Sequence, residues 1–226
     1  MKLRYSLVLA SIALFSTGCG SKYFIQKDAY SGVKKVAVVQ HAINPHFLLG
    51  TANSDEAKTK TIEKDFEVIT KEMAGSYAVT PLAEMVANPA YTGAGGKNAW
   101  DGYYSAKGAA FFSADEDMLQ AATISADTAK KLCEGLGVDA VAVIYESWGI
   151  ESYALGFRAK SRNGYVINMF DKNGTKVWGD VVWGTSEEGM GLAAGVLAAD
   201  VDTYVLNNGQ AFTAALKEAN DHIAKK

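Results

Sequence analysis

The chain has 226 residues, a formal net charge of −3 at pH 7 and 49% hydrophobic residues. This length is sufficient for one well-formed core, with or without elaborations. The mildly acidic charge argues against a nucleic-acid partner, which would require a basic surface.

The first 18 residues have the three parts of a secretory signal peptide. Lys2 and Arg4 supply positive charge, Leu7–Phe15 (LVLASIALF) is apolar, and small residues precede Cys19. The apolar part is too short for a membrane span, which needs about 20 residues. The Ser-Thr-Gly-Cys sequence that ends at Cys19 resembles the lipobox of bacterial lipoproteins, with Ser16 where that family most often has leucine.

This resemblance implies that the Cys19 thiol carries diacylglycerol and becomes the acylated N-terminus after cleavage. Residues 19–32 are then a lipidated tether, and residues 33–226 form a single domain. Several acyl chains hold a protein durably at a membrane, whereas one chain does so only marginally. Gly20 and Ser21 stand where an aspartate would favour inner-membrane retention, which implies the periplasmic face of the outer membrane. The alternative is an ordinary signal peptide and an incidental thiol.

Strands and helices are predicted to alternate after the tether. Val33–Val39 (VKKVAVV) is rich in valine, which is typical of a strand. Residues 54–75 carry apolar side chains spaced by four, three and four positions, which predicts an amphipathic helix. A short strand is predicted at Tyr77–Thr80, and a short helix around Leu82–Val86.

Residues 88–110 are rich in glycine and aromatic residues, so no long helix is predicted there. The aromatic side chains suit either a recognition surface or packing on the core, and we favour the second interpretation slightly. They are Tyr91, Trp100, Tyr103 and Tyr104.

A helix is predicted over residues 125–137, followed by a strand over residues 138–148. The strand is apolar on both faces through Ile144, which indicates a central position in a sheet. Cys133 lies on the predicted buried face of the helix and is interpreted as an inert core thiol. Because Cys19 is the only other cysteine, we expect no disulfide within the chain. The predicted apolar stripe is Ala126, Ala129, Cys133 and Leu136.

An Asn-Gly pair at 173–174 separates the strand-like segments 164–171 and 175–186, which predicts a β-hairpin. Asp171 and the Asn-Gly pair also resemble the start of a calcium loop. Asp180 stands where such a loop needs its closing glutamate, so we favour the hairpin.

Residues 189–200 (GMGLAAGVLAAD) combine glycine with apolar residues. The spacing of Gly189, Gly191 and Gly195 departs from the dinucleotide-binding pattern and argues against a phosphate-binding turn. We predict either a small-residue helix packed on the sheet or an apolar segment that meets a partner or the bilayer. Residues 210–226 are predicted to form an amphipathic helix. Its apolar face consists of Phe212, Leu216, Ala219 and Ile223.

The sequence lacks the Gly-x-Ser-x-Gly and His-Glu-x-x-His motifs of common hydrolases. His41 and His46 flank Pro45 and are predicted as loop side chains rather than as a metal-binding pair. Acidic residues 115–117 suit a helix N-terminus. We therefore expect no catalytic, cofactor or metal site. The alternative is a periplasmic enzyme or small-ligand binder whose cleft is formed by loops around these histidines and acids.

The order of these segments resembles a group of envelope lipoproteins with a small α/β domain. The resemblance rests on the lipobox, on residues 34–39 (KKVAVV), 129–148 (AKKLCEGLGVDAVAVIYESW) and 168–178 (NMFDKNGTKVW), and on the C-terminal helix. The group includes the curli-secretion channel subunit, the activator lipoproteins of penicillin-binding proteins and the N-terminal domain of the Tol–Pal translocation protein. The chain has no counterpart of the long transmembrane hairpins of the curli channel. Cys19 is the one functional residue that the resemblance transfers.

The resemblance implies an α/β fold class: a three-layer domain with a mixed sheet flanked by helices, a C-terminal hairpin and an amphipathic helix. It also implies a non-enzymatic accessory or assembly factor that acts through protein–protein contacts. The expected partners are the membrane, through the lipid on Cys19, and other envelope proteins, with self-association left open.

Overall fold

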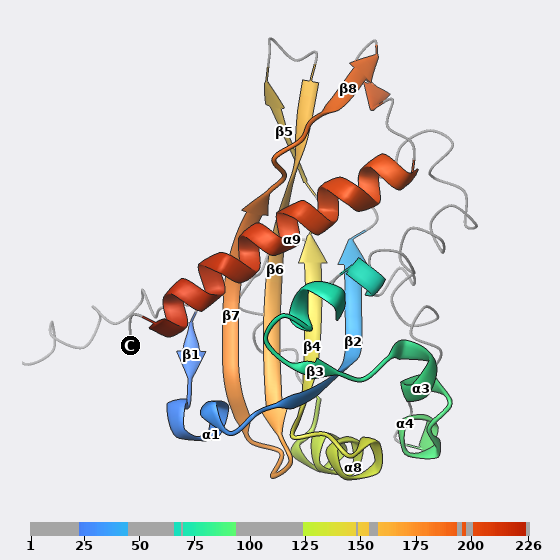
Figure 1. Cartoon of the computed structure of the whole chain (residues 1–226), viewed down its shortest axis with the longest axis vertical. Helices are drawn as coiled ribbons and strands as arrows, with labels where there is room; N and C mark the ends of the chain where they lie inside the picture. Colours follow the sequence, from blue (N-terminus) through green and yellow to red (C-terminus); the bar gives the residue numbers. More distant parts are fainter. Residues whose placement is uncertain are drawn as a thin grey trace, which may run out of the picture.

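The computed structural model shows a mixed β-sheet flanked by helices, which confirms the predicted α/β class (Figure 1). The sheet has the strand order β1-β7-β6-β4-β2-β3, and β5, β8 and β9 lie off this path. The described residues are 23–44, 66–68, 70–93, 124–147, 149–153, 158–193, 196–197 and 201–224.

One half of the sheet is parallel. Strand β2 (Lys35–Asn44) runs parallel to β3 (Ala78–Val79) and to β4 (Ala140–Ser147). Strand β4 lies between β2 and β6, and residues 140–146 are buried. Residues 140–147 of the predicted segment therefore form a central strand, as the sequence predicts.

The other half of the sheet is antiparallel. Strand β6 (Arg158–Asp171) pairs with β4 and with β7 (Lys176–Thr185). The backbone N–H groups of Asn173 and Thr175 both donate to Asp171 Oδ1, each at 2.9 Å. The carboxylate of Asp171 thus closes the turn between β6 and β7, and the predicted hairpin is confirmed.

Strand β6 continues beyond the body of the sheet and forms an antiparallel arm with β5 (Ile150–Tyr153) and β8 (Met190–Ala193), visible at the top of Figure 1. Strand β9 (Val196–Leu197) pairs with β8. The prediction of a helix over residues 189–200 is wrong. Glycine is unfavourable inside a helix, and the extended segment is instead stabilised by backbone pairing with β6.

Helix α8 (Ala126–Leu136) has the predicted capping residues. The Ser125 side chain accepts a hydrogen bond from the backbone N–H of Thr128, and Gly137 ends the helix at a φ of 60°. The buried face differs from the predicted stripe in two positions, because Ala126 is exposed and Leu132 is buried. The buried residues of α8 are Ala129, Leu132, Cys133 and Leu136.

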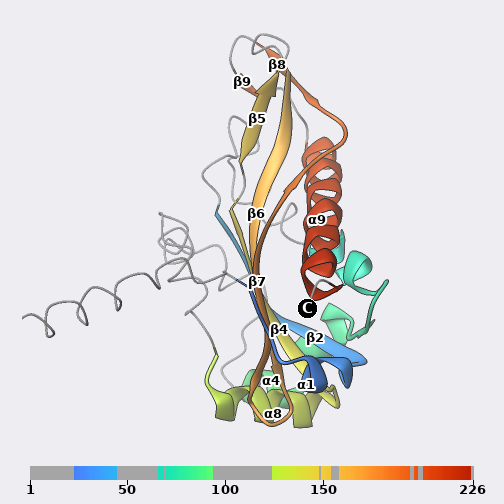
Figure 2. The same cartoon turned by 90° about the vertical axis from the view of Figure 1, so that its left-hand side faces the viewer.

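Helix α9 (Val201–Ala224) is longer than the predicted segment 210–226, and it packs on β6 and β7 (Figure 2). The Phe212 ring contacts the Tyr165 ring at 5.0 Å between centroids. A Cβ atom at Gly184 in β7 would lie 1.7 Å from the carbonyl oxygen of Ala211. Glycine at this position therefore permits the close approach of the helix to the sheet.

The described part of the predicted tether is folded. Strand β1 (Phe24–Ile25) pairs with β7, and helix α1 (Lys27–Ser31) follows it. The Tyr30 hydroxyl hydrogen bonds the Tyr77 hydroxyl, and the Tyr30 ring lies 5.8 Å from the Trp178 ring. This segment belongs to the domain rather than to a free linker.

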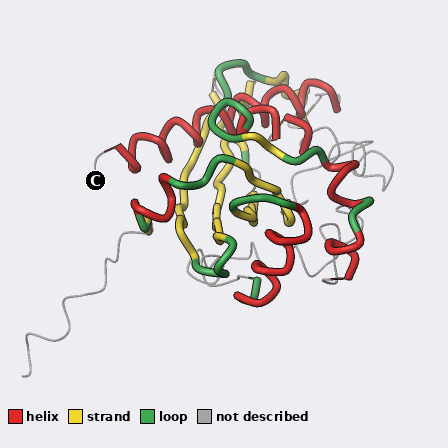
Figure 3. Tube along the Cα trace, turned by 60° about the horizontal axis from the view of Figure 1, so that its bottom comes forward, coloured by secondary structure: helices red, strands yellow, loops and turns green. Residues whose placement is uncertain are grey.

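The remaining described helices are short. Residues 66–68 and 70–73 are helical, which agrees with the C-terminal part of the predicted helix 54–75. Helix α3 (Leu82–Val86) is where the sequence predicts it, and α4 (Pro89–Gly93) starts the glycine-rich segment. Figure 3 shows helices on more than one side of the strands. Among the described residues, no helix is both long and apolar enough to cross a membrane.

We predict that Gly184→Ala destabilises the domain by about 3 kcal/mol, because the new methyl group would overlap the backbone of α9 at Ala211. Urea unfolding followed by circular dichroism measures the change. Gly191→Ala is the matched control, since a Cβ atom at Gly191 meets nothing within 4 Å. Equal stabilities of the two variants would contradict the close approach.

Candidate functional site

Most of the residues selected from the sequence lie outside the described residues. Cys19, the predicted lipidation site, is among them, and its role stays a prediction. The others are His46, Trp100, Tyr103, Tyr104 and the acidic residues 115–117.

His41 does not lie in a loop, as the sequence predicts, but in strand β2, opposite Ile144 of β4. The strand continues past the predicted end because a register shift between Val38 and Gln40 lets the pairing with β4 resume. The prediction that His41 lies in a loop is therefore wrong.

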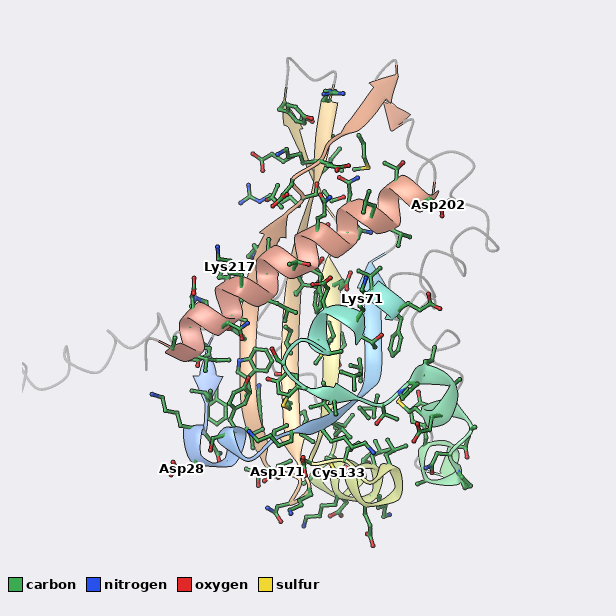
Figure 4. The ribbon with its side chains drawn as sticks, viewed as in Figure 1. Asp28, Lys71, Cys133, Asp171, Asp202 and Lys217 are labelled. Carbon is green, nitrogen blue, oxygen red and sulfur yellow. The ribbon has the colours of Figure 1, made fainter. Side chains whose placement is uncertain are left out.

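Two other predicted residues have structural roles. Tyr91 is buried against the core, as favoured from the sequence. Cys133 is buried, and its Sγ lies 3.9 Å from the carbonyl oxygen of Phe170. Burial, with a smaller contribution from Asp171, raises the pKa of the Cys133 thiol to about 12, so the thiol is inert as predicted. Figure 4 shows Cys133 and Asp171 together at the α8 end of the sheet.

The sequence analysis missed a buried polar network under the N-terminal half of α9. Asn163 Nδ2 donates to Tyr165 Oη at 3.2 Å and to Asn208 Oδ1 at 3.0 Å. Tyr165 Oη donates to the backbone carbonyl of Asn208 at 3.3 Å. Because these groups would be costly to bury unpaired, they fix how α9 sits on β6.

A second polar contact lies at the C-terminal end of α9. His222 Nδ1 is 2.9 Å from Asp180 Oδ2, and its Nε2 is 3.9 Å from Glu218 Oε1. Burial raises the pKa of the Asp180 carboxyl, and the hydrogen bond from His222 opposes this shift in part. His222 stands three positions after Ala219, a residue of the predicted apolar stripe. This helical spacing is the sequence signal that indicates the sheet-facing side for His222.

The same two carboxylates also cover the outer edge of β7. The backbone N–H of Val181 donates to Asp180 Oδ1 at 2.9 Å, and that of Trp183 donates to Glu218 Oε2 at 3.1 Å. Unpaired N–H groups at a sheet edge are a template for pairing with another chain. The carboxylates therefore block strand addition along this part of β7.

The sheet face opposite to α9 has two exposed aromatic side chains. Successive side chains of β7 point to opposite faces of the sheet, so Asp180 and Val182 face α9 and Trp183 points to the other side. Phe24 of β1 is paired with Gly179, which lies on the same face as Trp183. The exposed fraction is 42% for Phe24 and 44% for Trp183. Trp183 lies across Gly164, where a Cβ atom would be 3.0 Å from its ring.

Basic residues follow the same face along the arm of β6. Arg158, Lys160 and Arg162 alternate with buried small or polar residues that point to the α9 side. Arg162 forms an ion pair of 3.8 Å with Glu151, and Lys160 lies 5.9 Å from the Tyr153 ring. We call the surface formed by Phe24, Trp183, Arg158, Lys160 and Arg162 the aromatic–basic face.

A surface hollow of about 580 Å³ is lined by residues 66, 67, 70, 71 and 74 and by the segment 79–83. Its polar side chains include Glu67, Thr70 and Lys71. Within the described part of the chain, no three His, Cys, Asp or Glu side chains are grouped so that they could hold a metal ion.

Comparisons with known proteins give structural neighbours of low similarity. No protein-family model and no curated protein matches the chain. The lipoprotein GNA1162 from Neisseria meningitidis has a TM-score of 0.36 and 16% identity, over 85% of this chain and 99% of that one. The hypothetical protein CT253 from Chlamydia trachomatis has a TM-score of 0.39 and 12% identity, over 84% of this chain and 95% of that one. The PelC dodecamer from Paraburkholderia phytofirmans has a TM-score of 0.29 and 12% identity, over 81% of this chain and 89% of that one.

The similarities are too low to carry an argument about activity or partners. The resemblance to the curli, penicillin-binding-protein-activator and Tol–Pal group stays a prediction.

We predict that Asp180→Asn gains stability relative to the wild type as the pH rises from about 3 to about 5.5, below the usual titration of histidine. The folded state binds the Asp180 proton more tightly than the unfolded chain, whose pKa is near 3.8. The contribution of this group to stability is therefore complete below the unfolded pKa and is lost as the pH rises through the folded pKa.

Urea unfolding at several pH values measures this difference in the free energy of unfolding. Asp28→Asn in α1, where the carboxylate is exposed, is the matched control. A difference between Asp180→Asn and the wild type that moves in the opposite direction would contradict the assignment of burial as the dominant cause.

Proposed function

We propose that the chain is a lipoprotein of the bacterial envelope, held by acyl groups on Cys19 at the periplasmic face of the outer membrane. In this proposal it is not an enzyme, but an accessory or assembly factor that acts through contacts with other envelope proteins. The observation that carries the proposal is the signal-like N-terminus that ends in Ser-Thr-Gly-Cys at Cys19.

The position of β1 supports an anchor close to the domain. Cys19 precedes Tyr23, the first described residue, by four positions. A fully extended chain spans at most about 14 Å over that length. Because β1 is paired with β7, the anchor would hold the folded domain next to the membrane surface.

The buried polar groups under α9 have a structural role that accounts for them without catalysis. Hydrogen bonds between α9 and the sheet join Asn163 and Tyr165 to Asn208, and Asp180 to His222. Their geometry serves to hold two elements together. We expect the envelope partner to bind a surface other than the buried contact between α9 and the sheet.

The anchor is tested by expressing the wild type, Cys19→Ala and Cys133→Ala in a Gram-negative host. We expect the wild type and Cys133→Ala to carry a tri-acyl mass on the N-terminal peptide and to fractionate with the outer membrane. Cys19→Ala should lack the acyl mass and leave the membrane. An unacylated wild type, or membrane fractionation that persists in Cys19→Ala, would contradict the anchor.

The accessory role is tested by crosslinking in cells, with mass spectrometry of the proteins that co-purify. We expect the acylated wild type to bring down a defined envelope protein, and Cys19→Ala to lose it. A chain that is acylated but always monomeric and solitary would contradict the accessory role while leaving the anchor intact.

A further inference from the structure

We propose that the aromatic–basic face rests on the phospholipid surface beside the anchor, with Phe24 and Trp183 at the level of the headgroups. This inference depends on the lipid at Cys19 proposed above. It adds a second, side-chain contact with the membrane and an orientation of the domain on it.

The first argument is the reach of the chain. Phe24 is five residues after Cys19, so its Cα lies at most about 18 Å from that of the acylated residue. Phe24 is 42% exposed in the folded domain. An exposed aromatic ring is thus held within a short distance of the bilayer by a strand that is itself part of the sheet.

The second argument is the distribution of exposed apolar side chains. Three large hydrophobic side chains are exposed among the described residues: Phe24, Trp183 and Leu206. Phe24 and Trp183 share the face opposite to α9, whereas Leu206 is on α9 itself. One side of the Trp183 ring lies on Gly164, and the side chain is 44% exposed. Tryptophan is favoured at membrane–water interfaces.

The third argument is charge. Arg158, Lys160 and Arg162 lie on the same face, and Glu151 offsets one of these charges. Near an anionic membrane, each basic side chain strengthens binding by about fivefold. An arginine- and lysine-bearing strand next to exposed aromatic rings matches a surface of phosphates over acyl chains.

A second copy of the chain fits this face less well. The N–H groups of Val181 and Trp183 at the edge of β7 already donate to the carboxylates of Asp180 and Glu218, so strand addition is blocked. Two copies that met with Arg158, Lys160 and Arg162 opposed would also repel each other. A lipid surface needs no strand pairing and attracts these basic side chains.

The contact of Trp183 is tested with the acylated protein, purified from membranes and reconstituted into vesicles of phosphatidylethanolamine and phosphatidylglycerol. Half of the vesicles contain phospholipids brominated near the headgroup, which quench nearby tryptophan. We expect the wild type to lose a larger fraction of its emission than Trp183→Tyr, a variant that keeps a ring over Gly164. Equal fractional quenching in the two proteins would overturn the proposal.

Transfer of the acylated protein between vesicles gives an independent readout. We expect Phe24→Ser and Trp183→Ser each to speed transfer about tenfold, because each loses the burial of a partly exposed ring. Leu206→Ser is the matched control and should transfer at the wild-type rate. Arg158→Gln with Arg162→Gln should make transfer less sensitive to salt. Circular dichroism establishes whether each variant is folded. If Trp183→Ser is unfolded, Trp183→Tyr takes its place.

The outcomes separate this inference from the proposed function. Absence of the acyl mass overturns both. An acylated protein whose Trp183 is unquenched, and whose Phe24 and Trp183 variants transfer like Leu206→Ser, overturns the membrane contact alone. Unquenched Trp183 together with crosslinks from this face to a second chain overturns it in favour of a chain–chain interface.

Discussion

The close packing of α9 on β6 and β7 is the constraint on which the rest of the structure depends. Gly184 leaves room for the backbone of α9 at Ala211, so the helix lies directly on the strands. The face that α9 covers is thereby used for the core, with the Tyr165 and Phe212 rings in contact. The exposed Trp183 side chain stands on the opposite face, where the residues of β4 and the adjoining part of β6 are buried.

Polar groups as well as apolar ones hold this helix on the sheet. The Asn163–Tyr165–Asn208 network holds one half of α9, and the Asp180–His222 pair holds its other end. Each group would be costly to leave unpaired in the interior. Asp180 has a further role, because its second carboxylate oxygen covers an edge N–H of β7. Helix docking and protection of the sheet edge therefore share one side chain.

The sequence predicts the parts of the fold that local patterns encode. The valine-rich β2, the apolar β4, the Asn-Gly hairpin and the capped α8 all follow from periodicity and turn residues. The segment 190–197 was predicted poorly, because its small apolar residues are compatible with a helix. Its described residues are strands that pair with β6 and with each other. Strand β1 is two residues long and has no periodicity at all.

The polar contacts could not be predicted because they join residues that are distant in the sequence. Asp180 and His222 are 42 positions apart, and Asn163 and Asn208 are 45 apart. Nothing in either local pattern indicates a partner. The aromatic–basic face was equally hidden, since it combines one residue of β1, one of β7 and three of β6 through the register of the sheet. The lipobox-like sequence that ends at Cys19 is a local signal, so the sequence alone supplies that prediction.

The account predicts that the acylated domain lies on the membrane by the aromatic–basic face. The most direct measurement is the accessibility of nitroxide labels at Phe24→Cys and Leu206→Cys to lipid-soluble oxygen and to a water-soluble nickel complex, in the membrane-anchored protein. Labelling is selective because Cys133 is buried and Cys19 would be acylated. The account predicts that the Phe24 label collides mainly with oxygen and the Leu206 label mainly with nickel. Equal exposure of both labels to nickel would contradict it.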